Sequence, residues 1–299
     1  MDIDCCRNVH VSNCSVNSPR DDGICLKSSY GLGFARATEN VQITNCGVSG
    51  FDEGTLLDGT FGRTGRGGTG RIKFGTESNG GFQNITISNC TFTYCHGLAL
   101  ETVDGGLLED ISISNITMRD IVSAPLFLRL GSRLRGPAGT VVGALRRVNI
   151  SNLVVYNADP RDGAILSGIP GHPIEDVALS NIQLWYRGGG TKAQAAIKPP
   201  EKEADYPEPS MFGPTPACGF YLRHVRGITL DNIQVHTLTA DLRPAFALED
   251  VAGADLARVK VPHSADVPVF ALANVTGLHI SQTEGVPDTQ KDRMERGTL

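Results

Sequence analysis

The chain has 299 residues, of which 40% are hydrophobic and only 6% aromatic, with 35 glycines, a single tryptophan and a formal net charge of −5. This composition fits a folded protein with an aliphatic core and many turns. The sequence holds no basic cluster of the kind that binds nucleic acid, and no apolar run approaches the roughly 18 residues of a membrane span. We therefore expect neither nucleic acid nor a membrane as a partner.

A short strand motif recurs along the chain, beginning with residues 9–13 (VHVSN). The later copies end at Asn45, Asn89, Asn115, Asn152, Asn181 and Asn232. Each copy alternates apolar and polar residues, which predicts a strand with one buried face. Asn tolerates turn conformations, and its recurrence at one position predicts a ladder of hydrogen-bonded side-chain amides. One copy alone would bury little, so the core must form by stacking.

A second strand is predicted after each motif, and its first and third positions are nearly always apolar. These strands cover residues 24–27, 72–75, 98–101, 126–129, 164–167, 220–223, 246–249 and 270–273. Alternation points the fourth position outward. The outer column is then Lys27, Gly75, Glu101, Arg129, Ser167, Arg223 and Glu249. The repeats predict an all-β fold, a single-stranded right-handed parallel β-helix over residues 1–283, with an outer face suited to a polysaccharide.

Two insertions interrupt the predicted coils. The first is Gly-rich and spans residues 51–70, and the second spans residues 187–217 and contains the sequence YPEP at 206–209. Long loops on a rigid scaffold usually shape a binding site. Residues 284–299 are polar, and we expect them to form a frayed tail.

An acidic pair, Asp21 and Asp22, stands directly before the second strand of the first coil. Two carboxyl groups at the entrance of a strand can act as general acid and general base in glycosidic bond cleavage. The pair alone is a weak signal, because most such pairs are solvated turns, but its position on a predicted β-helix strengthens it.

With these residues the sequence resembles glycoside hydrolase family 28, the polygalacturonase and rhamnogalacturonase group. The resemblance rests on residues 7–14 (RNVHVSNC), 21–28 (DDGICLKS) and 75–81 (GTESNGG) and extends to about residue 260. It implies an inverting hydrolase of pectic chains, with Asp21 in the role of general acid and Asp22 as half of the base. We expect no cofactor and no metal.

The sequence departs from the family at two catalytic positions. The family's further Asp belongs to an Asn-Thr-Asp-Gly motif one coil earlier, so we expect that residue to precede Met1 and the chain to be truncated at its N-terminus. Full-length relatives are expected to be secreted or periplasmic. The family also has Gly-His-Gly after the acid pair, where this chain has Thr69 between glycines.

A third departure concerns substrate binding. The family's Arg-Ile-Lys, which grips a uronate carboxylate, should lie on the coil of residue 98, yet Arg71 and Lys73 stand one coil earlier and Glu101 takes the expected place. Either the cations keep a carboxylate contact, or the subsite holds a neutral sugar bonded by Glu101. The second alternative is slightly favoured, because Glu101 would repel a uronate. The predicted substrate-binding residues are Lys27, Arg71, Lys73, Glu77, Asn79, His96, Glu101 and Arg129.

Two other functions compete with a glycosidase that acts as a monomer on pectic poly- or oligosaccharides. A β-helix lyase or epimerase often uses Ca²⁺ to neutralise a uronate and should show a denser acidic cluster. A non-catalytic carbohydrate-binding β-helix is the other alternative, because the further catalytic Asp is absent from the chain.

Overall fold

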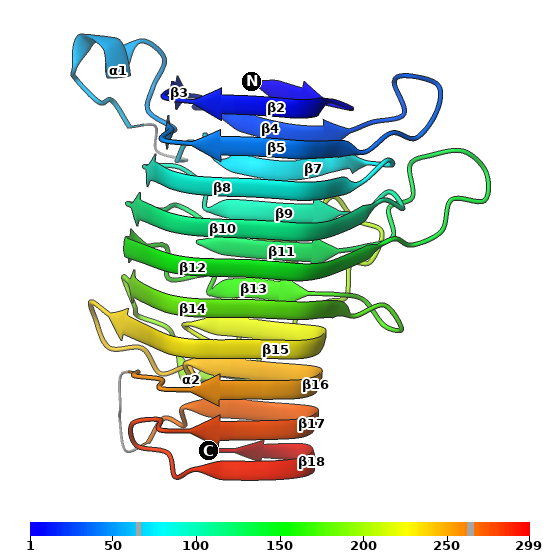
Figure 1. Cartoon of the computed structure of the whole chain (residues 1–299). Helices are drawn as coiled ribbons and strands as arrows, with labels where there is room; N and C mark the ends of the chain where they lie inside the picture. The colour runs from blue at the N-terminus through cyan, green and yellow to red at the C-terminus, as the bar shows by residue number, and fades with distance from the viewer. Residues whose placement is uncertain (64–66, 262–265) are drawn as a thin grey trace.

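The computed structural model describes residues 1–63, 67–261 and 266–299, and it forms one continuous parallel β-helix (Figure 1). The longer strands pair in parallel down one side of the stack. They are β2 (Arg7–Ser12), β5 (Thr38–Thr44), β8 (Phe82–Thr93), β10 (Leu107–Arg119), β12 (Ala144–Ala158) and β14 (Ile174–Tyr186), with β3 (Ser15–Asn17) and β6 (Gly47–Ser49) extending the first two coils. The expected fold class is confirmed.

Shorter strands form the other side of each coil. They are β1 (Asp2–Asp4), β4 (Ile24–Ser28), β7 (Ile72–Ser78), β9 (Leu98–Thr102), β11 (Leu126–Leu130) and β13 (Ala164–Ser167). In the last coils, β15 (Phe220–Thr237), β16 (Phe246–Ala257) and β17 (Phe270–Ser281) run through both sides. We call the outward surface of the shorter strands, together with the first residues of β15 to β17, the outer face.

The register of the shorter strands confirms most of the predicted outer column. Glu101 is opposite Arg129, which is opposite Ser167, and the column continues through Arg223 to Glu249. The first coils differ, because the register of β4 against β7 shifts after Leu26. The alternate residues point inward and form an aliphatic core with few aromatic rings.

The Asn at the end of each motif bends the chain within the longer strands, or between β2 and β3 and between β5 and β6 in the first two coils. Asn152, for example, has a φ of 55°, and the Asn at the end of every other motif copy adopts a similar left-handed conformation, which Asn tolerates better than most residues. The predicted ladder is confirmed from Asn89 to Asn232, where each amide donates to the preceding Asn. A second ladder, from Asn84 through Asn40 to Asn8, was not expected from the sequence.

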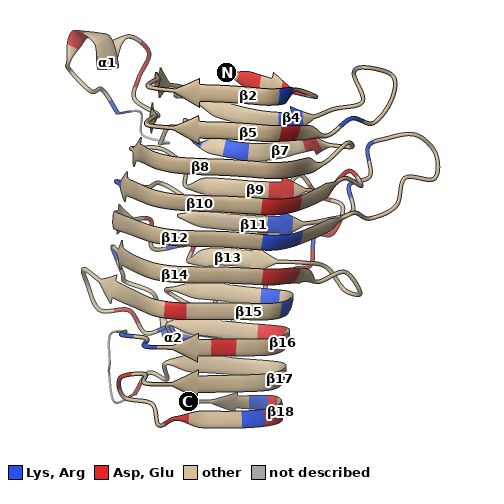
Figure 2. Cartoon of the chain, viewed as in Figure 1, with Lys and Arg blue, Asp and Glu red and all other residues tan. Residues whose placement is uncertain are grey.

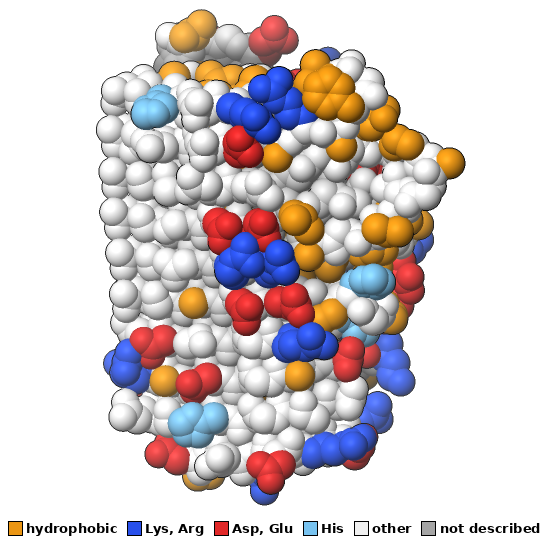
Figure 3. All heavy atoms as spheres, turned by 45° about the vertical axis from the view of Figure 1, so that its right-hand side comes forward, with side chains coloured by type: hydrophobic (Ala, Val, Ile, Leu, Met, Phe, Trp, Pro, Cys, Tyr) orange, Lys and Arg blue, Asp and Glu red, His pale blue; other side chains and the backbone are white. Residues whose placement is uncertain are grey.

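Charged residues form a band where the longer strands begin (Figures 2 and 3). Opposite charges lie on neighbouring strands, and the pairs Arg7–Glu39, Arg146–Glu109 and Arg226–Glu175 have nitrogen–oxygen distances of 2.8, 2.8 and 3.0 Å. The arginine of each pair is at least one third exposed to solvent, so each pair contributes little to stability. In the described part of the chain no helix is long and apolar enough to cross a membrane.

The two insertions differ in how they lie. The first carries the short helix α1 (Thr55–Asp58) and projects from the stack, and its residues 64–66 lie outside the described residues. The second contains α2 (Lys192–Ala195) and the 3₁₀ turn η1 (Pro209–Phe212) and folds back onto the outer face.

The expectation of a frayed C-terminal tail was wrong. Residues from Thr289 to Thr298 form β18, which pairs antiparallel with β17. The last parallel strand of a stack has a free row of backbone groups, and β18 satisfies that row while the partly buried Met294 packs against the core. Main-chain hydrogen bonding therefore orders a segment whose composition alone suggests disorder.

Candidate functional site

A cluster of buried charges lies where the acid pair meets the outer face. Asp22 precedes β4, Arg71 precedes β7 and Lys73 is the outward residue of β7, so neighbouring coils bring the three together. Arg71 Nε donates to Asp22 Oδ1 over 2.7 Å, and Lys73 Nζ lies 3.4 Å from Asp22 Oδ2. Glu101, outward on β9, lies 3.5 Å from Lys73 Nζ. The sequence placed these four residues near one another, and the structure brings them into contact.

The second insertion completes this cluster with two side chains that the sequence did not identify. The guanidinium of Arg71 binds both carboxylate oxygens of Glu208, and Lys73 Nζ lies 3.3 Å from the hydroxyl of Tyr206. His96 Nδ1 lies 3.9 Å from Glu208 and has no hydrogen-bond partner. The YPEP sequence in a long insertion was the available signal, but no local pattern shows which coil such a loop contacts.

The pKa values of the Asp22 and Glu101 carboxyl groups are shifted in opposite directions. Burial alone would raise the pKa of Asp22, but the charges of Arg71 and Lys73 outweigh it and lower the pKa. Burial raises the pKa of Glu101 to about 7 despite the same two cations. Asp22 is therefore held ionised, whereas Glu101 exchanges its proton near neutral pH.

His96 is held neutral in this cluster. Burial, helped by the charge of Arg71, lowers the pKa of His96 to about 4. Its ring is partly exposed, with 24% of the side chain accessible. At neutral pH its ring can therefore donate one hydrogen bond to a polar ligand and accept another, but it carries no charge to attract an anion.

Much of the outer face is not open, which corrects the expectation of a continuous polysaccharide-binding surface. Lys73, Glu101 and Arg129 point outward, as predicted, yet at most 1% of each is exposed. The second insertion covers them. A glycan therefore cannot touch these three predicted binding residues, or Arg71, which is also only 1% exposed, while the insertion lies as it does here.

Asp21 and Lys27 are more accessible than the covered residues. Asp21 is exposed, and its Oδ1 accepts the backbone N–H of Asp22 over 2.8 Å. Lys27 is partly exposed and lies between Asp2, at 3.1 Å, and Glu77, at 3.9 Å. Asn79 is separate from this group, because its amide donates to the backbone carbonyl of Arg135.

Asp21 also lines a pocket beside the first insertion. The pocket has a volume of about 420 Å³, and neither Arg71 nor Lys73 lines it. Its polar lining includes Asn17, Arg20 and Glu53. Asp21 and Asp22 are thus adjacent in sequence, but one is open to solvent and the other is held by buried charges.

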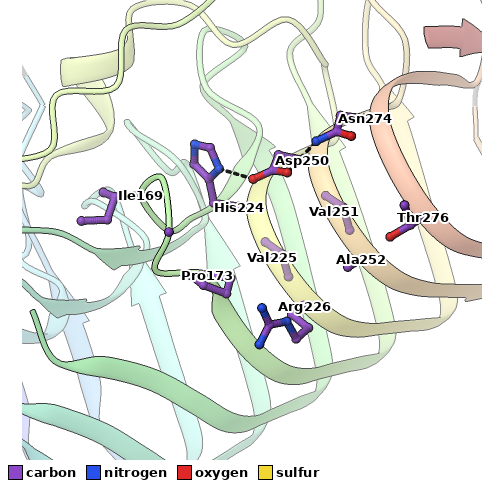
Figure 4. Close-up of a pocket in the computed structure, with 11 residues that line it drawn as sticks. Ile169, Pro173, His224, Val225, Arg226, Asp250, Val251, Ala252, Asn274 and Thr276 are labelled. Carbon is purple, nitrogen blue, oxygen red and sulfur yellow. Dashed lines mark hydrogen bonds and ion pairs between the residues drawn. The ribbon is translucent and has the colours of Figure 1, made fainter. Parts of the chain in front are cut away.

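A second pocket lies near the other end of the stack (Figure 4). It has a volume of about 220 Å³ and contains none of the predicted site residues. His224 Nδ1 lies 2.6 Å from Asp250 there, and Asn274 donates to the same carboxylate. These contacts link neighbouring coils and hold the pocket wall in place.

The described residues contain no group of three or more His, Cys, Asp or Glu placed to hold a metal ion. Comparisons with known proteins add no assignment, because no protein-family model matches the chain and no curated protein matches it.

Proposed function

We propose that the protein is a glycosidase that hydrolyses O-glycosidic bonds of pectic polysaccharides or oligosaccharides by an inverting general acid–base mechanism. The observation that carries the proposal is the paired environment of Asp21 and Asp22. Asp22 is held ionised by Arg71 and Lys73, as a base requires, and the neighbouring Asp21 is open to solvent and ligand. The resemblance of these residues to family 28 supports the pectic substrate class.

In this mechanism, Asp22 accepts a proton from a water molecule that attacks the anomeric carbon. Asp21 donates a proton to the glycosidic oxygen as the bond between that oxygen and the anomeric carbon breaks. The reaction yields two shorter sugars, and water supplies the new hydroxyl on the opposite face of the ring. Arg71 and Lys73 position the Asp22 carboxylate, and Glu101 lies between those two cations.

Pectic oligosaccharides provide the direct test, with three readouts on one sample: new reducing ends, absorbance of an unsaturated product, and binding. We expect reducing ends without the chromophore. Asp21→Asn should lower the rate at least 100-fold, because general acid catalysis typically contributes 10²- to 10⁴-fold. Asp58→Asn, which changes an exposed carboxylate on α1, is the matched control and should keep the wild-type rate.

Other outcomes separate the competing functions. An undiminished rate in Asp21→Asn would remove Asp21 from the acid role. The unsaturated chromophore would indicate a lyase, and saturable binding without any bond cleavage would indicate a carbohydrate-binding protein.

A further inference from the structure

The second insertion closes the outer face from β7 to β15, roughly 19 Å of the stack at 4.8 Å between neighbouring strands. The outward residues over this stretch are all nearly inaccessible to solvent. They are Lys73, Ala99, Glu101, Phe127, Arg129, Ile165, Ser167, Tyr221 and Arg223. By contrast, Asp2 on β1 is exposed and Lys27 on β4 is partly exposed, although Cys25, the outward residue of β4 opposite Lys73, is buried. A glycan thus has access to the outer face beside Asp22 but not beyond it toward β15.

Buried arginines fasten the insertion to the stack. Arg129 Nη2 donates to the carbonyls of Glu201 and Lys202 over 2.9 and 3.1 Å. Arg223 Nη1 donates to the carbonyl of Pro199 over 2.8 Å, and Arg223 pairs with the carboxylate of Glu201. Lifting this segment would leave charged donors without partners in a low-dielectric environment, which is strongly unfavourable.

Apolar packing fixes the same insertion further along. Phe212 of η1 is buried between Phe127 and Tyr221, and its ring centroid is 6.4 Å from that of each. The guanidinium of Arg129 also lies over the Phe212 ring, 5.2 Å from its centroid. These contacts indicate that the second insertion is fixed in place and does not open in every catalytic cycle. We call the part of the insertion that covers the outer face, residues 199–212, the wall.

The wall begins at the proposed catalytic site. Glu208 binds Arg71, which in turn binds Asp22, and Tyr206 contacts Lys73, two residues after Arg71, on β7. A sugar chain lying along β1 and β4 therefore meets these two side chains as soon as it passes Asp22.

We propose that the second insertion makes this enzyme act on the ends of sugar chains. Glu208 and Tyr206 block the path of the chain, and we call these two side chains the stop, which the terminal sugars contact. This inference rests on the proposed glycosidase function, because it specifies where along a substrate the bond is cut. Cleavage is confined to the few sugar units that fit between the stop and the catalytic pair.

End-labelled pectic oligosaccharides and the long polymer test the proposal. We expect small products of constant size from one end, a ladder of progressively shorter labelled chains, and little early loss of polymer viscosity. Internal fragments at early times, with a rapid fall in viscosity, would overturn the end-acting assignment while leaving the glycosidase assignment intact. If no reducing ends form on any of these substrates, the glycosidase proposal itself fails.

Weakening the wall gives a second test. Phe212→Ala removes the buried ring that anchors the insertion, so we expect internal cleavage of the polymer to increase at least several-fold relative to end cleavage. Lys192→Ala alters an exposed residue of the same insertion and should keep the wild-type product pattern. Circular dichroism and thermal melting establish that each variant is folded. A folded Phe212→Ala variant with an unchanged product pattern would contradict the role of the insertion as the wall.

Binding supplies a test that does not depend on turnover. Asp21→Asn is titrated with polygalacturonate fractions of equal mass but different chain length. If the wall confines binding to chain ends, the number of protein-binding sites per unit mass of polygalacturonate should rise in proportion to the number of chain ends. A constant number of sites per unit mass would mean binding within chains and would overturn the proposal.

Discussion

Glu101 is fully buried on β9, and neither of its carboxylate oxygens has a hydrogen-bond partner. Its nearest charges are Lys73 and Arg71, at 3.5 and 3.9 Å. A buried carboxyl without hydrogen bonds favours its neutral form. The raised pKa of Glu101 therefore makes the stability of the charge cluster sensitive to pH near neutrality.

The pH dependence of unfolding checks this account of Glu101. Because burial raises its pKa to about 7 in the folded state, the stabilising contribution of the protonated side chain is complete below pH ~4.5 and is lost as the pH rises through about 7. We expect Glu101→Gln to gain melting temperature relative to the wild type between pH 5 and pH 8. Glu53→Gln, an exposed control, should follow the wild-type curve. A difference in melting temperature between Glu101→Gln and the wild type that does not change with pH would contradict the raised pKa of Glu101.

Among the structural elements, the turn at the end of each motif depends most on one residue type. Asn152 combines a left-handed backbone, with a φ of 55°, and two ladder bonds of 3.1 Å, one donated to Asn115 and one accepted from Asn181. A side chain without an amide loses the bonds, and one other than glycine also strains the backbone.

Two substitutions at this turn separate the two contributions. Asn152→Gly keeps the backbone relaxed and should lower the free energy of unfolding by about 1–2 kcal/mol through the lost ladder bonds. Asn152→Ala should lower it by about 1 kcal/mol more, because alanine is strained at positive φ. Ser151→Ala, at the preceding residue, should change it by less than about 0.5 kcal/mol. Urea denaturation measures all three, and equal effects of Gly and Ala would contradict the backbone contribution.

At the scale of the whole molecule, the repeated motifs predicted the stack because each local pattern agreed with the others. The same alternation placed Lys73, Glu101 and Arg129 at outward positions correctly. What the outer face contacts was not predictable, because the path of residues 187–217 depends on distant partners such as Arg129 and Phe127. The role of β18 was missed for the same reason, since its order comes from the unpaired edge of β17.

The insertion also changes the interpretation of the site. The sequence predicted an open face with a row of polar side chains, whereas the structure shows a covered charge cluster next to an exposed acid, Asp21. The sequence could place Asp22 beside Arg71 and Lys73 because those residues lie on neighbouring coils. It could not show that Glu208 would bind the same guanidinium from a loop more than a hundred residues later.

The measurement that tests the central claim most directly is proton NMR of the first sugar released from a pectic oligosaccharide. If Asp22 activates water while Asp21 protonates the leaving oxygen, the new anomeric proton first appears in the configuration opposite to that of the cleaved linkage, before mutarotation mixes the two forms. First appearance of the retained configuration, or signals of an unsaturated sugar, would contradict the account.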